Sequence, residues 1–268
     1  MFADLKAAWS AGSDNNISLI AAGIAHYALL ALVPALAALV LGYGLFANPD
    51  TVAADIQFLS KNLPQAAASL IGDELRNLTG GADKAKGLGL LGSLAIALFG
   101  ARSAAMALMT GLKITFHAGE PRSLVRGNLV ALAITIGGIV GLAIMGGASA
   151  ALAVLSGPAG SILGFIVLAT GAVGGAAALY RFAPDRRSPE WSEVLPGAVL
   201  FAFGWIVATA AFAFYAANFG SYNATYGSLG AVVVLITWFY ATAFLLLLGA
   251  ELAAVKGRGK DVSPSKAS

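Results

Sequence analysis

Two charged residues interrupt apolar stretches and are the first candidates for chemistry. Arg102 lies in "ALFGARSAAMAL" and Glu251 lies in "LLLLGAELAAV". A charge at the centre of a membrane helix costs about 2.5–3.5 kcal/mol on insertion scales, so such charges usually pair or serve a function. At about 1.5 Å per helical residue, both fall in the half of the membrane nearer the cytoplasm. We therefore predict that Arg102 and Glu251 meet inside a helix bundle, with His26 and Tyr27 nearby.

This predicted cluster has a functional and a structural interpretation. In the functional one it lines an inward-facing cavity, where Arg102 holds an anionic head group and His26 passes a proton. In the structural one Arg102 reaches toward the membrane interface, Glu251 is wetted at its helix end, and His26 is a packing residue. The residues alone leave both interpretations open.

Other routes to catalysis are few. The chain has no cysteine and only two histidines, which excludes thiolate chemistry and a His-rich metal site. The sequence has no G-x-S-x-G elbow, phosphate-binding loop or H-E-x-x-H pair. His117 and Glu120 are three residues apart beside a proline, which predicts a solvated loop. We therefore expect no enzyme activity, no catalytic residue, no metal and no cofactor.

The composition places the chain in the membrane. Hydrophobic residues make up 59% of the 268 residues and charged residues only 11%, against about 45–50% and 25% in soluble domains. The net charge of +3 matches the basic bias of cytoplasmic loops better than a nucleic-acid surface, so no nucleic-acid partner is expected.

Six apolar stretches are long enough to cross a membrane as helices. Their backbone must form its hydrogen bonds internally, so they predict an all-α polytopic integral membrane protein with a bundle of six transmembrane helices. The predicted spans are Ile17–Phe46, Leu88–Met109, Leu129–Leu155, Ala159–Phe182, Val194–Ala217 and Leu229–Val255. Pro34 removes a backbone donor within the first span, which predicts a kink near Leu30.

The distribution of basic residues gives an orientation, with both termini in the cytoplasm. Residues 1–16 are predicted as a cytoplasmic N-terminal segment with a short interfacial helix, 17–255 as the transmembrane domain, and 256–268 as a flexible cytoplasmic tail. The extracytoplasmic loop 48–87 is predicted to hold two amphipathic helices, the first opened by Asn48 and Pro49, the second by Pro64. These helices either lie on the outer leaflet or cover a cavity.

Glycines four residues apart predict close packing of the spans, because small residues let helix backbones approach in lipid. A pliable interface between moving helices would leave the same pattern. The pairs are Gly137 with Gly141, Gly160 with Gly164, and Gly171 with Gly175.

The motif that opens the predicted sixth span is the most specific in the chain. It consists of Tyr226, Gly227, Ser228, Leu229 and Gly230, and the same span ends in Gly249, Ala250 and Glu251. With "AAGIAHYALLALVPALAALVLGYGLF", "ARSAAMALMTGLKITFHAGEPRS" and "EWSEVLPGAVLFAFGWIVA", this stretch resembles the YihY/virulence factor BrkB family of bacterial inner-membrane proteins. The resemblance covers nearly all of Ile17 to Val255. It places His26 where the family usually has a tyrosine, which weakens a family-wide role for that histidine.

The resemblance implies a multi-pass protein of the bacterial inner (plasma) membrane. Members of this family have been labelled ribonuclease BN or linked to serum resistance and lipid export. Short, mildly basic loops argue against a ribonuclease. The first hypothesis is a transporter or flippase-like protein for a lipid or other amphipathic anion, with Arg102 on the head group and Glu251 as its partner or competitor. The alternative is a non-transporting membrane scaffold or envelope-assembly protein, with a homo-oligomer or an envelope protein as its partner.

Overall fold

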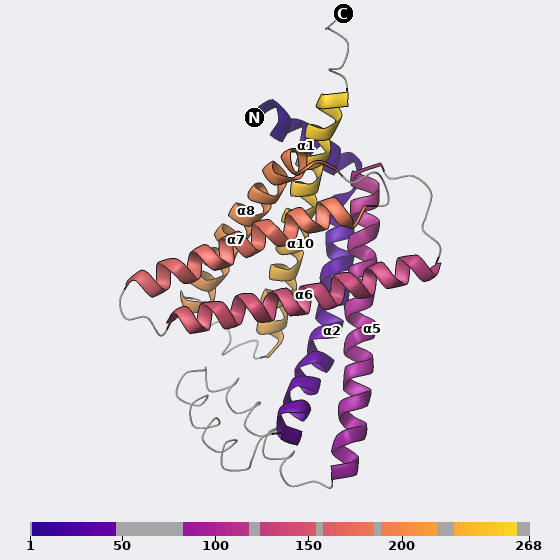
Figure 1. The fold of residues 1–268 in the computed structure, drawn as a ribbon, viewed down its shortest axis with the longest axis vertical. Coiled ribbons are helices and arrows are strands. Elements are labelled where there is room, and N and C mark those ends of the chain that lie inside the picture. Colours follow the sequence, from indigo (N-terminus) through magenta and orange to yellow (C-terminus); the bar gives the residue numbers. More distant parts are fainter. Residues whose placement is uncertain are drawn as a thin grey trace, which may run out of the picture. The chain divides into compact units, whose positions relative to one another are not determined.

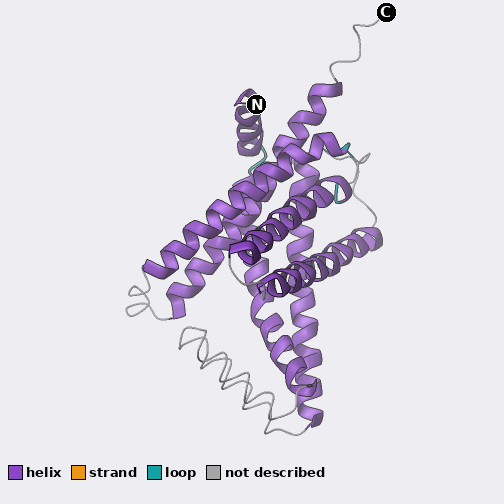
Figure 2. Ribbon diagram, turned by 60° about the vertical axis from the view of Figure 1, so that its left-hand side comes forward, coloured by secondary structure: helices purple, strands orange, loops and turns teal. Residues whose placement is uncertain are grey.

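The computed structural model describes residues 2–46, 83–117, 124–153, 158–184, 189–218 and 228–261, in which the regular secondary structure is helical and no strand occurs (Figure 2). The protein is therefore all-α over these ranges. The helices are α1 (Phe2–Asp14), α2 (Ile17–Phe46), α5 (Asp83–Thr115), α6 (Leu124–Ala153), α7 (Pro158–Phe182), α8 (Trp191–Asn218) and α10 (Ser228–Asp261).

Each predicted span coincides with a helix, but the membrane-crossing assignment is confirmed only in part. Four helical segments in the described ranges are long and apolar enough to cross a membrane, and α1 with Ile17–Leu32 makes a fifth if that bent pair counts as one span. In α6 the apolar stretch found is the shorter Gly127–Gly138. The four segments are Leu91–Thr115, Ile162–Phe182, Trp191–Tyr215 and Val232–Arg258. The chain is thus a membrane protein with four or five candidate spans.

Several predictions fall at or beyond the edges of the described residues. The two amphipathic helices were predicted within loop 48–87, and residues 48–82 of that loop lie outside the described residues. Tyr226 and Gly227 also lie outside them. Ser228 is the first residue of α10, which also contains Gly230. Helix α2 includes Pro34, and the kink there stays a prediction.

The chain divides into two compact units. One contains Met1–His26 with Arg102–Ser268, and the other contains Tyr27–Ala101. In the second unit α2 and α5 approach closely at Gly100, where an added Cβ would lie 2.8 Å from the Cβ of Ala31. A side chain at Gly100 would therefore push these two helices apart.

In the first unit α8 packs against both α7 and α10, α6 packs against α7, and α1 packs against α10 (Figure 1). The buried core gathers where α5 and α7 end and α8 begins. Its largest fully buried apolar or aromatic side chains are Leu112, Tyr180, Val194 and Leu247. This end of the unit therefore contains the largest fully buried side chains of the described residues.

The closest helix approach in this core joins α8 and α10 at Gly197 and Gly249. A Cβ added to Gly249 would lie 2.5 Å from the Gly197 carbonyl oxygen and 2.6 Å from the Tyr180 hydroxyl. Among the glycines of the predicted pairs, Gly171 packs against Met145 of α6. Nothing lies within 4 Å of a Cβ added at Gly137, Gly141, Gly164 or Gly175. Spacing alone therefore did not identify the glycines at which backbones meet.

We expect Gly249→Ala to lower the free energy of unfolding by about 1–3 kcal/mol, because the new methyl group overpacks the α8–α10 contact. The matched control is Gly175→Ala on α7, where the methyl group enters open space. This variant should raise the free energy of unfolding by about 0.5–1 kcal/mol, because alanine is more stable than glycine inside a helix. Thermal unfolding in detergent compares the two variants with the wild type. Equal stability of both variants would contradict the close contact.

Candidate functional site

Glu251 is completely buried in α10, and its carboxyl group is hydrogen-bonded through one oxygen only. The side-chain amide of Asn15 donates to Oε1 at 2.7 Å, and the Thr115 hydroxyl donates to the same oxygen at 2.9 Å. Oε2 is also buried and has no hydrogen-bond partner among the described residues. The carboxyl therefore joins the end of α5 and the α1–α2 turn to α10.

Asn15 reaches Glu251 from a sharp corner between α1 and Ile17–Leu32, which are bent by 69°. Asn16 next to it has a φ of 54°, a left-handed conformation that asparagine adopts more readily than most residues. The amide of Asn15 still donates to the Ala11 carbonyl at 2.9 Å and that of Asn16 to Ser13 at 3.1 Å, which ends α1. The two asparagines thus form the corner and present one amide to α10.

Thr115 is the last residue of α5, and the chain turns away immediately after it. His117 has a φ of 48°, and its amide donates to the Ile114 carbonyl at 3.1 Å. The His117 ring nitrogen Nδ1 lies 3.2 Å from the Thr115 carbonyl oxygen. These contacts fix the helix end, so the Thr115 hydroxyl is held toward α10.

Helix α1 covers Glu251 through further contacts with α10. Lys256 Nζ and Asp4 Oδ2 are 2.6 Å apart, and the Trp9 ring packs edge-on against Phe244 with 6.0 Å between centroids. A Cβ added to Gly12 would lie 3.6 Å from Glu251 Cγ. Helix α10 continues to Asp261, so it includes the first residues of the segment 256–268 that was predicted as a flexible tail. Residues 262–268 lie outside the described residues, and the flexibility of the tail stays a prediction.

The predicted pairing of Arg102 with Glu251 is not formed. Arg102 Nη2 donates instead to Asn128 Oδ1 of α6 at 2.5 Å, and Arg102 is half-buried while Asn128 is exposed. Thr115, the α5 partner of Glu251, comes thirteen residues after Arg102, about 20 Å along the helix. The error arose because α5 continues beyond the predicted end at Met109, which places Arg102 deeper than expected.

The described hydrogen-bond partners of Glu251 do not include His26 or Tyr27. His26 is exposed on α2, while Tyr27 is 40% exposed and belongs to the other unit. No three histidine or carboxylate side chains of the described residues gather closely enough to hold a metal ion. The sequence analysis also missed Asn15 and Thr115, because a polar residue at a helix end resembles an ordinary cap.

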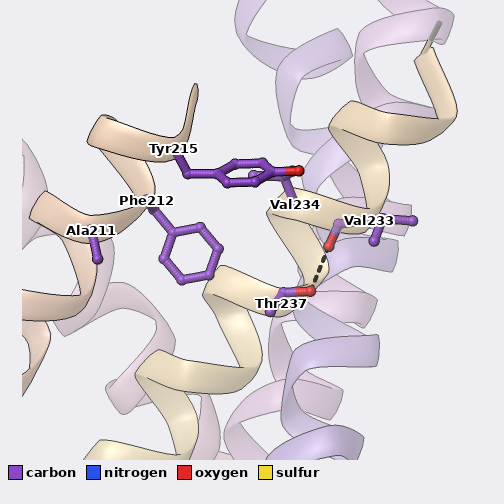
Figure 3. Close-up of a pocket in the computed structure, with 6 residues that line it drawn as sticks. All are labelled: Ala211, Phe212, Tyr215, Val233, Val234 and Thr237. Carbon is purple, nitrogen blue, oxygen red and sulfur yellow. Dashed lines mark hydrogen bonds between the residues drawn. The ribbon is translucent and has the colours of Figure 1, made fainter. Parts of the chain in front are cut away.

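An apolar cleft with a volume of about 360 Å³ separates part of α8 from α10 (Figure 3). Figure 3 shows the rings of Phe212 and Tyr215 extending from α8 toward α10. Thr237 donates its hydroxyl to the Val233 carbonyl at 2.7 Å, so this polar group is satisfied within its own helix. The lining residues are Ala211, Phe212, Tyr215, Val233, Val234 and Thr237. A hydrocarbon chain suits this lining.

Comparisons with known proteins agree with this membrane architecture. A family model described as "Virulence factor BrkB" matches residues 8–268. The ribonuclease-like protein YfkH of Bacillus subtilis is 41% identical over 85 residues, which cover 32% of this chain and 30% of YfkH. No solved structure matches the chain.

Two UPF0761 membrane proteins align over most of the chain. The protein from Pseudoalteromonas translucida is 26% identical over 256 residues, covering 90% of this chain and 81% of its own length. The protein from Nitrosospira multiformis is 28% identical over 257 residues, covering 90% of this chain and 58% of its own length. The alignment thus spans most of the first relative, little more than half of the second, and less than a third of YfkH.

A double-mutant cycle in detergent tests the separation of the two charges. We expect the losses in unfolding free energy from Arg102→Ala and Glu251→Gln to add within about 0.5 kcal/mol, because the side chains are far apart. Thr115→Val and Glu251→Gln share a hydrogen bond, so their losses should deviate from additivity by about 0.5–3 kcal/mol. A deviation from additivity of about 0.5–3 kcal/mol between Arg102→Ala and Glu251→Gln would instead support the pair predicted from the sequence.

Proposed function

The chain belongs to the BrkB virulence factor family, and from that premise we propose that it is a bacterial inner-membrane transporter or flippase-like protein for a lipid or another amphipathic anion. The observation that carries the proposal is the environment of Arg102. The ribonuclease-like name belongs to the Bacillus relative, and nothing in the residues of this chain extends that activity to it.

Arg102 lies near the middle of the candidate span Leu91–Thr115. Its partner Asn128 is neutral, and Arg102 forms no ion pair with a carboxylate of the described residues. The guanidinium therefore keeps its full positive charge at a depth where that charge is expensive. An arginine has five N–H donors in a fork that matches phosphate and carboxylate oxygens, so an anionic head group is the partner that fits best.

The cleft between α8 and α10 supports a cargo with a hydrocarbon part. Its lining is apolar except for the Tyr215 hydroxyl, because the Thr237 hydroxyl is bonded to its own helix. An acyl chain entering such a cleft exchanges contacts with neighbouring lipids for contacts with Phe212 and Val233 at little cost. An anionic lipid combines the two chemistries that Arg102 and this cleft offer.

Reconstitution in liposomes tests transport directly. The wild type should exchange head-group-labelled anionic lipid between leaflets faster than empty liposomes, with a smaller effect on zwitterionic lipid. Arg102→Ala should lower the rate about tenfold or more, since a charged hydrogen bond contributes about 1.5–3 kcal/mol. Arg102→Lys should retain part of the rate, because it keeps the positive charge.

Lys6→Ala removes an exposed cation on α1 and serves as the matched control, with an expected rate equal to that of the wild type. Absence of exchange for every lipid class by the folded wild type would contradict lipid transport. The alternative function, a non-transporting membrane scaffold, would then be favoured. It predicts that Arg102→Ala impairs the assembly of envelope partners.

The proposed orientation places both termini in the cytoplasm and loop 48–87 outside, from the distribution of basic residues. Because the chain has no cysteine, single cysteines report topology without background. A membrane-impermeant maleimide added to intact spheroplasts should label Ser60→Cys but not Ser265→Cys, whereas broken cells should show labelling of both. The opposite labelling pattern would reverse the proposed orientation.

A further inference from the structure

The hydrogen bonds of Glu251 distinguish its two oxygens. Asn15 and Thr115 both donate to Oε1, while the equally buried Oε2 has no partner among the described residues. A carboxylate carries its charge on both oxygens, and each needs donors when buried. A protonated carboxyl has one carbonyl oxygen that accepts and one hydroxyl oxygen. The arrangement around Oε1 is that of the carbonyl oxygen of the neutral acid.

No cation compensates a charge at this position. Glu251 forms no salt bridge with a described residue, and Lys256 is bonded to Asp4. His117 and Arg258 are both exposed, and neither forms a salt bridge with Glu251. Charged and titratable groups also lie on the surrounding elements. They include Asp4, Lys6 and Asp14 on α1, His26 on α2, Lys113 on α5 and His117 just after it, Tyr180 and Arg181 on α7, Glu193 on α8, and Lys256 and Arg258 on α10.

Burial then decides between the two forms of the carboxyl. Burying an ionised carboxylate without a paired cation costs far more than burying a neutral acid whose carbonyl oxygen is already hydrogen-bonded. The two donors to Oε1 are neutral amide and hydroxyl groups, and they serve the protonated form as well as the ionised one. The neutral acid is therefore the form that this pocket accommodates.

We propose that Glu251 is a proton-binding site that fastens the α1–α2 corner onto the ends of α5 and α10. The proton resides on Oε2 while Asn15 and Thr115 hold Oε1. When Glu251 releases this proton to water, the remaining carboxylate needs hydration, and α1 must move away from α10 to admit it. Docking of α1 thereby follows the protonation of one buried carboxyl. This site does not depend on lipid transport, because a protein that moves no lipid could bind a proton in the same way.

Infrared spectroscopy of the purified protein in nanodiscs at neutral pH tests the proposal, since an exposed glutamate is ionised there. The wild type should show a carboxylic-acid C=O band that shifts on ¹³C labelling of glutamate and disappears in Glu251→Gln. Asp4→Asn removes a partly exposed carboxylate from the same α1–α10 interface and should leave the band unchanged. Absence of the band in the folded wild type would overturn the proposal.

A nearly isosteric variant keeps the test decisive if Glu251→Gln does not fold. Thr115→Val removes one of the two donors to Oε1, so the acid band should move to higher frequency. A band that does not respond to Thr115→Val belongs to another group and would also overturn the proposal. Hydrogen exchange of the backbone amides measures how often α1 separates from α10. Raising the pH should increase this opening in the wild type and should not change it in Glu251→Gln.

Discussion

The backbone contact between Gly197 and Gly249 is the constraint on which the arrangement of the first unit depends. Lipid supplies no hydrophobic drive between helices, so close packing and interhelical hydrogen bonds must hold them together. At this crossing the Tyr180 hydroxyl donates to the Leu246 carbonyl at 2.6 Å, which ties α7 to α10. Glu251 follows Gly249 by two positions, so the same crossing fixes the point at which the carboxyl meets α1 and α5.

The two charges that interrupt the apolar sequence are accommodated in different ways. Arg102 remains a cation beside the neutral amide of Asn128, at a depth where a second, oppositely charged group would stabilise it. Glu251 is completely buried, with neutral donors on one oxygen. An ion pair between Arg102 and Glu251 would have neutralised both charges and limited both side chains to stabilising the fold. Because they are separate, Arg102 is available to the proposed anionic cargo and Glu251 to the proposed proton.

The sequence predicts the helices well, because long apolar stretches leave the backbone no other way to satisfy its hydrogen bonds in lipid. Helix ends are harder to predict, since polar residues at the membrane boundary, such as Lys113 at the end of α5, fit a helix and a loop equally well. The predicted Arg102–Glu251 pair is not formed, because α5 ends later than predicted and Arg102 lies further from that helix end than expected. The contact of Glu251 with Asn15 joins positions 236 apart, and no local pattern in one sequence encodes such a pairing.

That long separation has a consequence for how the protein is made. Asn15 and Asp4 leave the ribosome before their partners, because Glu251 and Lys256 are synthesised 236 and 252 residues later. Helix α1 cannot take its final position until α10 has been inserted, so the contacts of Glu251 with Asn15 form only after α10 is in place. Closing so long a loop adds only a modest entropic cost, because that cost grows with the logarithm of loop length. A chain interrupted within α10 would leave α1 without its docking site, and docking of α1 therefore distinguishes a chain that contains α10 from one that lacks it.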